Sequence, residues 1–151
     1  MTTSQLCFPI IVFGVQPSGT FDIRVDEEAL LTATPLALQS GIYNASLIVD
    51  TSGCSYKINS VKQVQRSRLP KFLSKVLNQP VTIGLQLDKC IAMEISDFKR
   101  RLATAFQDQE FLEVWEDAGL DTSDFQASVM RSDSFKDIID YLLEKSGSGQ
   151  V

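Results

Sequence analysis

Hydrophobic and polar residues in the first half of the chain follow the two-residue period of β-strands. An apolar run at 8–15 is followed by the turn sequence Gln16–Gly19 and then by strict alternation at 21–26. Pro9, near the start of the run, is tolerated where a strand begins or lies at a sheet edge. These two segments are predicted to pair as a β-hairpin.

A second hairpin has the strongest pattern in the chain. Segments 42–49 and 54–64 are rich in β-forming residues and flank a four-residue link, 50–53, that contains Gly53. The alternation set by Tyr56 and Ile58 changes phase before Val61, which predicts a β-bulge near residues 59–60. Between the hairpins, residues 26–40 are predicted to form a loop with one helical turn, because Thr32, Thr34 and Pro35 disfavour a long helix.

The next segment predicts a helix inserted among the strands. Pro70 suits the first turn of a helix, and Pro80 follows its end. Alternation at 81–87 then predicts a further strand. The helical segment carries an apolar stripe that is expected to face the core, at Leu69, Phe72, Leu73, Val76 and Leu77.

After residue 88 the apolar residues recur with a helical period. Ser96 is the expected N-cap of the first helix. Gly119 should end the second, a short helix should start at about Thr122, and Ser134 should begin the last. The second helix is expected to turn four residues inward, namely Phe111, Val114, Trp115 and Ala118.

This order of elements predicts an α+β fold. A mostly antiparallel sheet of about five strands with one inserted helix would be covered on one face by the C-terminal helices. The length of 151 residues suits one domain over 1–145, with a flexible tail at 146–151.

Composition excludes several kinds of catalytic site. The chain has no histidine, which removes Ser-His-Asp triads, Cys-His pairs and histidine metal sites. It has no glycine-rich phosphate-binding motif. Its three cysteines are widely spaced and are expected to be reduced and mostly buried. No catalytic residue, metal or cofactor is therefore predicted, and an enzyme assembled from dispersed residues is a less favoured alternative.

The charges are sorted along the chain, and this changes the functional expectation. Residues 1–93 carry eight basic and six acidic groups, whereas residues 94–151 carry six basic and thirteen acidic groups. Two faces of opposite sign result. The acidic one comprises Glu110, Glu113, Glu116, Asp117, Asp121 and Asp124, beside the single tryptophan, Trp115. The basic one comprises Lys57, Lys62, Arg66, Arg68, Lys71 and Lys75.

Each face can be merely solvated, can pair with the other within one chain or between copies, or can bind another molecule. An acidic helical face suits a basic protein, since complementary potentials speed association. Core packing is the favoured role for Trp115, and a partly exposed position would make it a binding hot spot. A sequence pI near 4.7 and the lack of interleaved aromatic residues disfavour nucleic acid.

The expected function is therefore non-catalytic protein binding, in the manner of a stoichiometric inhibitor or an immunity-type protein. The alternatives are binding of nucleic acid or a phosphate ligand through the basic face, and a structural role in a homo-oligomer. The apolar run at 7–15 lacks a preceding basic residue, and no apolar run is long enough to span a bilayer. A cytoplasmic protein without membrane contact is expected.

Overall fold

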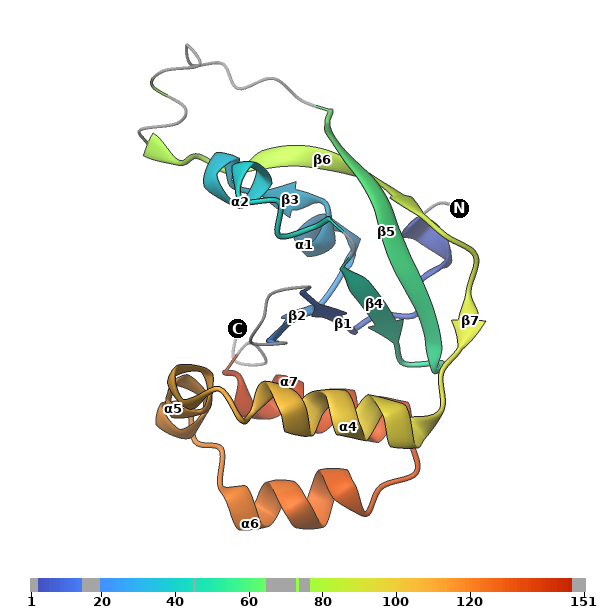
Figure 1. The fold of residues 1–151 in the computed structure, drawn as a ribbon, viewed down its shortest axis with the longest axis vertical. Helices are drawn as coiled ribbons and strands as arrows, with labels where there is room; N and C mark the ends of the chain where they lie inside the picture. The colour runs from blue at the N-terminus through green and yellow to red at the C-terminus, as the bar shows by residue number, and fades with distance from the viewer. Residues whose placement is uncertain (1–2, 15–19, 45, 65–72, 74–76, 148–151) are drawn as a thin grey trace.

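The computed structural model describes residues 3–14, 20–44, 46–64, 73 and 77–147 (Figure 1). Its strands form an antiparallel sheet in the order β2-β1-β4-β5-β6-β3, and β7 pairs with the start of β5. The α+β class and the antiparallel pairing are confirmed, whereas the predicted count of about five strands is too low. The strands are β1 (Ile10–Phe13), β2 (Phe21–Arg24), β3 (Thr32–Ala33), β4 (Leu47–Asp50), β5 (Cys54–Gln63), β6 (Val81–Leu87) and β7 (Ile91–Ala92).

The helices after the last strand cover one face of the sheet, as expected. Figure 1 shows them as a layer below β1, β2 and β4. The first begins after Glu94 and not after the predicted Ser96, whereas Ser134 caps the last one as predicted, by accepting a hydrogen bond from the backbone of Asp137. The elements are α4 (Ile95–Ala105), α5 (Gln109–Asp117), α6 (Thr122–Phe125), the π-helix η2 (Gln126–Met130) and α7 (Phe135–Lys145).

The sheet is buried on both faces at its centre, which the sequence did not predict. Side chains of β1 alternate between two cores, with Ile11 and Phe13 facing the helices and Ile10 and Val12 facing the opposite way. The second core lies under the curl of β5, β6 and β3 and includes Leu30 of α1 (Glu27–Leu30). The prediction that only one face of the sheet is covered was therefore wrong, because the sheet curls over itself and buries its second face.

The strand pairing of both predicted hairpins is confirmed, whereas the turn predicted at 16–19 lies outside the described residues. β1 pairs with β2, and β4 pairs with β5 across the link at 50–53. The register of β5 against β6 shifts between Ile58 and Ser60, where the β-bulge was predicted. β4 begins only at Leu47, because residues 41–44 form a turn with Gly41 at a φ of 69°.

The segment 26–40 holds more structure than the predicted loop with one helical turn. Asp26 caps α1, β3 follows, and Thr34 then caps α2 (Pro35–Gln39) with Pro35 in its first turn. The Thr and Pro residues that disfavour a long helix are those that begin a short one.

Most of the predicted helix at 69–77 lies outside the described residues. Leu73 and Leu77 are described, and both are helical. Their side chains are exposed, at 40% and 57% of the full area, so the inward orientation predicted for these two residues was wrong.

The cysteines differ from the expectation of three reduced, mostly buried thiols. Pairing of β5 with β7 places Cys90 beside Cys54, and the two form a disulfide with a Cα–Cα distance of 5.5 Å. Cys7 is free and exposed. The partners lie 36 residues apart in sequence and meet only through sheet pairing, so their spacing carries no local signature.

Candidate functional site

Helix α5 is held firmly by its inner face. Trp115 is only 7% exposed, and its ring lies 5.4 Å from that of Phe21 and 5.7 Å from that of Phe106, measured between centroids. Phe111 and Leu112 pack against the same core. Trp115 therefore has the core position that the sequence favoured, and it anchors the helix.

The helix is rotated relative to the predicted orientation. Val114 was expected to face inward, yet it is 67% exposed, and Ala118 is also exposed. Leu112, which lay outside the predicted stripe, faces the core instead. The rotation follows from the aromatic contacts of Phe111 and Trp115, because a large ring buries more apolar area than a valine side chain.

Exposed Val114 lies among carboxylates. Glu110 precedes it by four residues and Asp117 follows it by three, so both are its neighbours on the helix surface. Glu113 is adjacent and also exposed. We call these four residues the α5 outer face. An apolar side chain with acidic neighbours is thus presented to solvent on a helix whose opposite face is buried.

The six predicted acidic residues do not act as one group. Asp121 caps α6 by accepting a hydrogen bond from the backbone N–H of Asp124 at 2.9 Å. The carboxylate of Asp124 accepts a hydrogen bond from the Tyr141 hydroxyl at 2.8 Å and lies 3.6 Å from Lys145 Nζ. The Tyr141 hydrogen bond is the main cause that lowers the pKa of Asp124; desolvation opposes it, and the nearby Lys145 ammonium adds a smaller lowering effect. These two residues are engaged within the chain.

The remaining acidic residues lie on α5. Glu113 accepts a hydrogen bond from the Gln109 side chain at 3.0 Å. Glu110, Glu116 and Asp117 are exposed, and their side chains form no ion pair or hydrogen bond within the described ranges. The last turn of α5 also contains no basic residue. Acidic side chains there oppose the helix dipole, so Glu116 and Asp117 lower the stability of the helix that carries them.

The basic face can be placed only in part. Lys57 and Lys62 are exposed on β5, and Arg66, Arg68, Lys71 and Lys75 lie outside the described residues. Neither lysine forms an ion pair with a described carboxylate. In Figure 1 the C-terminal end of β5 and helix α5 lie far apart along the longest axis of the molecule. Lys62 forms no ion pair with the α5 outer face within the described residues.

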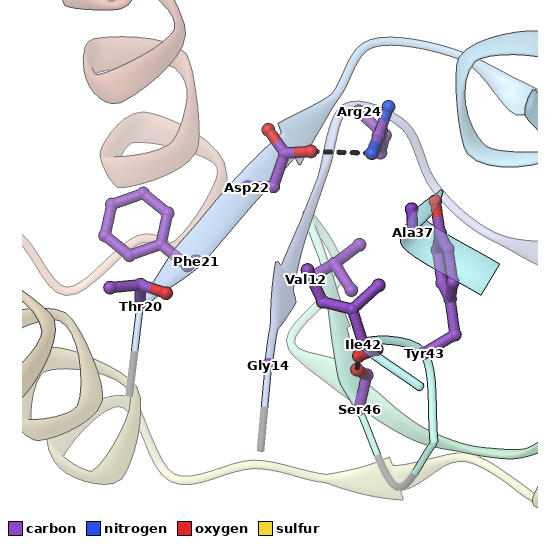
Figure 2. A pocket seen from close by; sticks show the side chains of 10 residues that line it. All are labelled: Val12, Gly14, Thr20, Phe21, Asp22, Arg24, Ala37, Ile42, Tyr43 and Ser46. Atoms are coloured by element: carbon purple, nitrogen blue, oxygen red, sulfur yellow. Dashed lines mark hydrogen bonds and ion pairs between the residues drawn. The ribbon is translucent and has the colours of Figure 1, made fainter. Parts of the chain in front are cut away.

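A pocket that the sequence did not indicate lies beside β1 and β2 (Figure 2). It encloses about 160 Å³. Asp22 and Arg24 of β2 form an ion pair at its rim, 2.7 Å apart, and Tyr43 forms one wall. Its residues come from β1, β2, α2 and the turn before β4, so no local pattern could have identified it.

Further chemistry is limited within the part of the chain that the structure describes. No group of three or more cysteine or carboxylate side chains is placed to hold a metal ion. No helix among these residues combines the length and the apolar character needed to cross a bilayer. Comparison with protein-family models, with curated proteins and with solved structures finds no significant match to this chain.

Proposed function

We propose that the chain is a protein-binding module whose α5 outer face engages a basic segment of another protein. The observation that carries the proposal is the 67% exposure of Val114 among Glu110, Glu113 and Asp117. Protein interfaces combine an apolar centre with a polar rim, and this surface offers both on a small scale. The matching partner segment carries an apolar side chain flanked by lysine or arginine.

The anchoring of α5 supports this proposal. Trp115 and Phe111 hold the helix in the aromatic core, so little backbone freedom remains to be lost when a partner binds. A rigid acidic surface also steers a basic partner during diffusion and raises the rate of association.

The unfavourable charges at the end of α5 also support the proposal. Glu116 and Asp117 oppose the dipole of their own helix and have no described counter-charge. A lysine or arginine from a partner would compensate both the carboxylates and the carbonyl end of the helix. Charged residues that destabilise the free protein, and whose charge a ligand compensates on binding, are typical of binding sites.

A stoichiometric inhibitor or immunity-type protein is one form that such a module takes. It would cover the basic surface of an effector with the α5 outer face and would need no catalytic group. Under this form the complex is one-to-one, tight at low salt, and weakened as ionic strength rises.

Affinity capture from native lysate at low salt, read by mass spectrometry, tests the proposal. The first bait is the unaltered chain, and the second carries Glu110→Gln, Val114→Ser and Asp117→Asn. The third is a charge-matched control with Glu28→Gln and Glu144→Gln, two exposed carboxylates on α1 and α7. Circular dichroism establishes that all three baits are folded.

A basic protein recovered with the first and third baits and lost with the second supports the proposal. It should then bind the purified chain directly with one-to-one stoichiometry in calorimetry. Recovery of the same partners by all three baits would contradict the role of the α5 outer face.

A further inference from the structure

The pocket beside β1 and β2 is open to solvent on one side, and apolar residues form much of its walls. Val12 of β1, Ala37 of α2 and Ile42 of the following turn supply apolar surface. Figure 2 shows the ring of Tyr43 along one side, with its hydroxyl at the same end as the Arg24 guanidinium. The lining therefore separates an apolar part from a hydrogen-bonding part, as ligand pockets do.

The hydroxyl of Tyr43 is the unusual group in this pocket. The Tyr43 residue is only 7% exposed, and its hydroxyl forms no hydrogen bond within the described ranges. The hydroxyl oxygen itself remains accessible from the pocket, because no fully buried side-chain oxygen of the described residues lacks a partner. Hydroxyls of largely buried tyrosines usually have a hydrogen-bond partner, and for this one the partner has to come from the pocket side. A tyrosine hydroxyl is protonated at neutral pH, and burial raises the pKa of Tyr43 further, so this group is a hydrogen-bond donor. By contrast, the nearby Ser46 hydroxyl already donates to the backbone carbonyl of Ile42 at 2.5 Å.

The pocket carries no net charge. Its charged lining residues in the described ranges are Arg24 and Asp22, which pair at 2.7 Å. Arg24 also donates to the backbone carbonyl of Ala29 at 3.3 Å, which fixes the guanidinium further. An anionic ligand would have to compete with the Asp22 carboxylate for Arg24, and a cation would have to approach Arg24. A neutral ligand neither competes with Asp22 for Arg24 nor is repelled by the guanidinium, so its binding carries no such free-energy cost.

The volume sets the size of the ligand. The cavity encloses about 160 Å³, and a cavity of about 150 Å³ with apolar walls accommodates benzene. One six-membered ring therefore fits within the walls of this pocket, which is open to solvent on one side.

We propose that this pocket binds a small neutral organic molecule of one six-membered ring, whose acceptor oxygen takes the hydrogen bond of the Tyr43 hydroxyl. The ring would contact Val12, Ala37 and Ile42, and the oxygen would lie at the Arg24 end. This proposal is independent of the α5 outer face, because the two sites share no residue.

The test is an NMR titration of the full ¹⁵N-labelled chain with three probes, namely cyclohexanone, benzoate and cyclohexylammonium. We expect cyclohexanone to shift the amide signals around Val12, Arg24 and Tyr43 and to saturate in the millimolar range that suits so few atoms. The two charged probes should bind more weakly. Absence of a saturable shift with cyclohexanone would overturn the proposal, and tighter binding of benzoate would overturn the preference for a neutral ligand.

Three variants locate the binding. Tyr43→Phe keeps the ring and removes the donor, and it should weaken cyclohexanone binding by roughly fivefold, the worth of one hydrogen bond. Ala37→Leu fills the cavity from α2 and should abolish binding. Leu36→Ala alters an exposed neighbour on the same helix outside the lining and should change nothing. Unchanged binding in Tyr43→Phe would contradict the proposed hydrogen bond, and unchanged binding in Ala37→Leu would contradict the proposed location of the site.

Discussion

The hydroxyl of Tyr56 donates a hydrogen bond to the fully buried carboxylate of Asp50 at 3.3 Å, across the hairpin of β4 and β5. The same carboxylate accepts hydrogen bonds from the backbone N–H groups of Cys7, Ser52 and Cys54 at 3.0–3.2 Å. Asp50 therefore joins the hairpin link, β5 and the segment before β1. A buried carboxylate is tolerated here because several donors compensate its lost hydration.

Removal of this carboxylate should be among the most destabilising single changes in the chain. Asp50→Ala leaves several buried donors without an acceptor and should lower the free energy of unfolding by about 3 kcal/mol or more. Tyr56→Phe removes one of the hydrogen bonds and should cost about 1 kcal/mol. Urea denaturation measures both, and equal losses in the two variants would contradict the central role of Asp50.

The disulfide predicts the number of free thiols. The chain has three cysteines, so protein purified under oxidising conditions and then unfolded should react with Ellman's reagent at one thiol, that of Cys7. Cys7→Ser should abolish the reaction. Replacement of Cys54 and Cys90 by serine should lower the free energy of unfolding by about 4 kcal/mol, given loop closure over 36 residues. Detection of three thiols before reduction would contradict the pairing.

A disulfide is more usual in oxidising compartments than in the cytosol. The cytoplasmic location expected from the sequence therefore stays a prediction. Measurement of the thiol state in the source cells is its direct test, since three reduced cysteines in the cell would favour the cytosol.

All three tyrosines have a raised pKa in the folded chain, and burial is the main cause at each. For Tyr141 the hydrogen bond to Asp124 adds to the effect. The folded state thus keeps phenolic protons that the unfolded chain releases near pH 10, so stability is full below that pH and falls as the pH rises above it. Absorbance at 295 nm should show later ionisation in native protein than in urea. Coincident titration curves would contradict this prediction.

The charges of α5 should have opposite effects at its two ends. Glu116→Gln with Asp117→Asn removes negative charge near the carbonyl end and should raise the free energy of unfolding by about 0.3–1 kcal/mol at low salt. Glu110→Gln removes a favourable charge from the first turn and should slightly lower the free energy of unfolding. Salt should reduce both effects. Urea denaturation at two ionic strengths is the measurement, and shifts of the same sign would contradict the dipole argument.

Much of the fold follows from local patterns in the sequence. The hairpin link at 50–53, the bulge in β5 and the capping serine of α7 depend on residues close together in the chain, and all three were predicted. The structure of segment 26–40 was not predicted, because short helices and two-residue strands contain too few positions to show a hydrophobic period.

The candidate sites were predicted less well. The sequence placed a solvated acidic surface on α5 but put Val114 in the core, since a period alone cannot fix how far a helix is rotated about its axis. That rotation depends on the rings of Phe21 and Phe106, which lie elsewhere in the chain. Asp121 and Asp124 belonged to the predicted acidic group, yet a cap and a tyrosine contact engage them.

By itself, the sequence determined the class of the fold, the principal hairpins, the C-terminal helices and the charge of the α5 surface, because these depend on neighbouring residues. Only the tertiary structure decided the second core, the Cys54–Cys90 bond, the exposure of Val114 and the pocket at Tyr43. Each of these joins segments far apart in the chain. Their contacts arise from the curl of the sheet and the packing of large side chains, which no local period encodes.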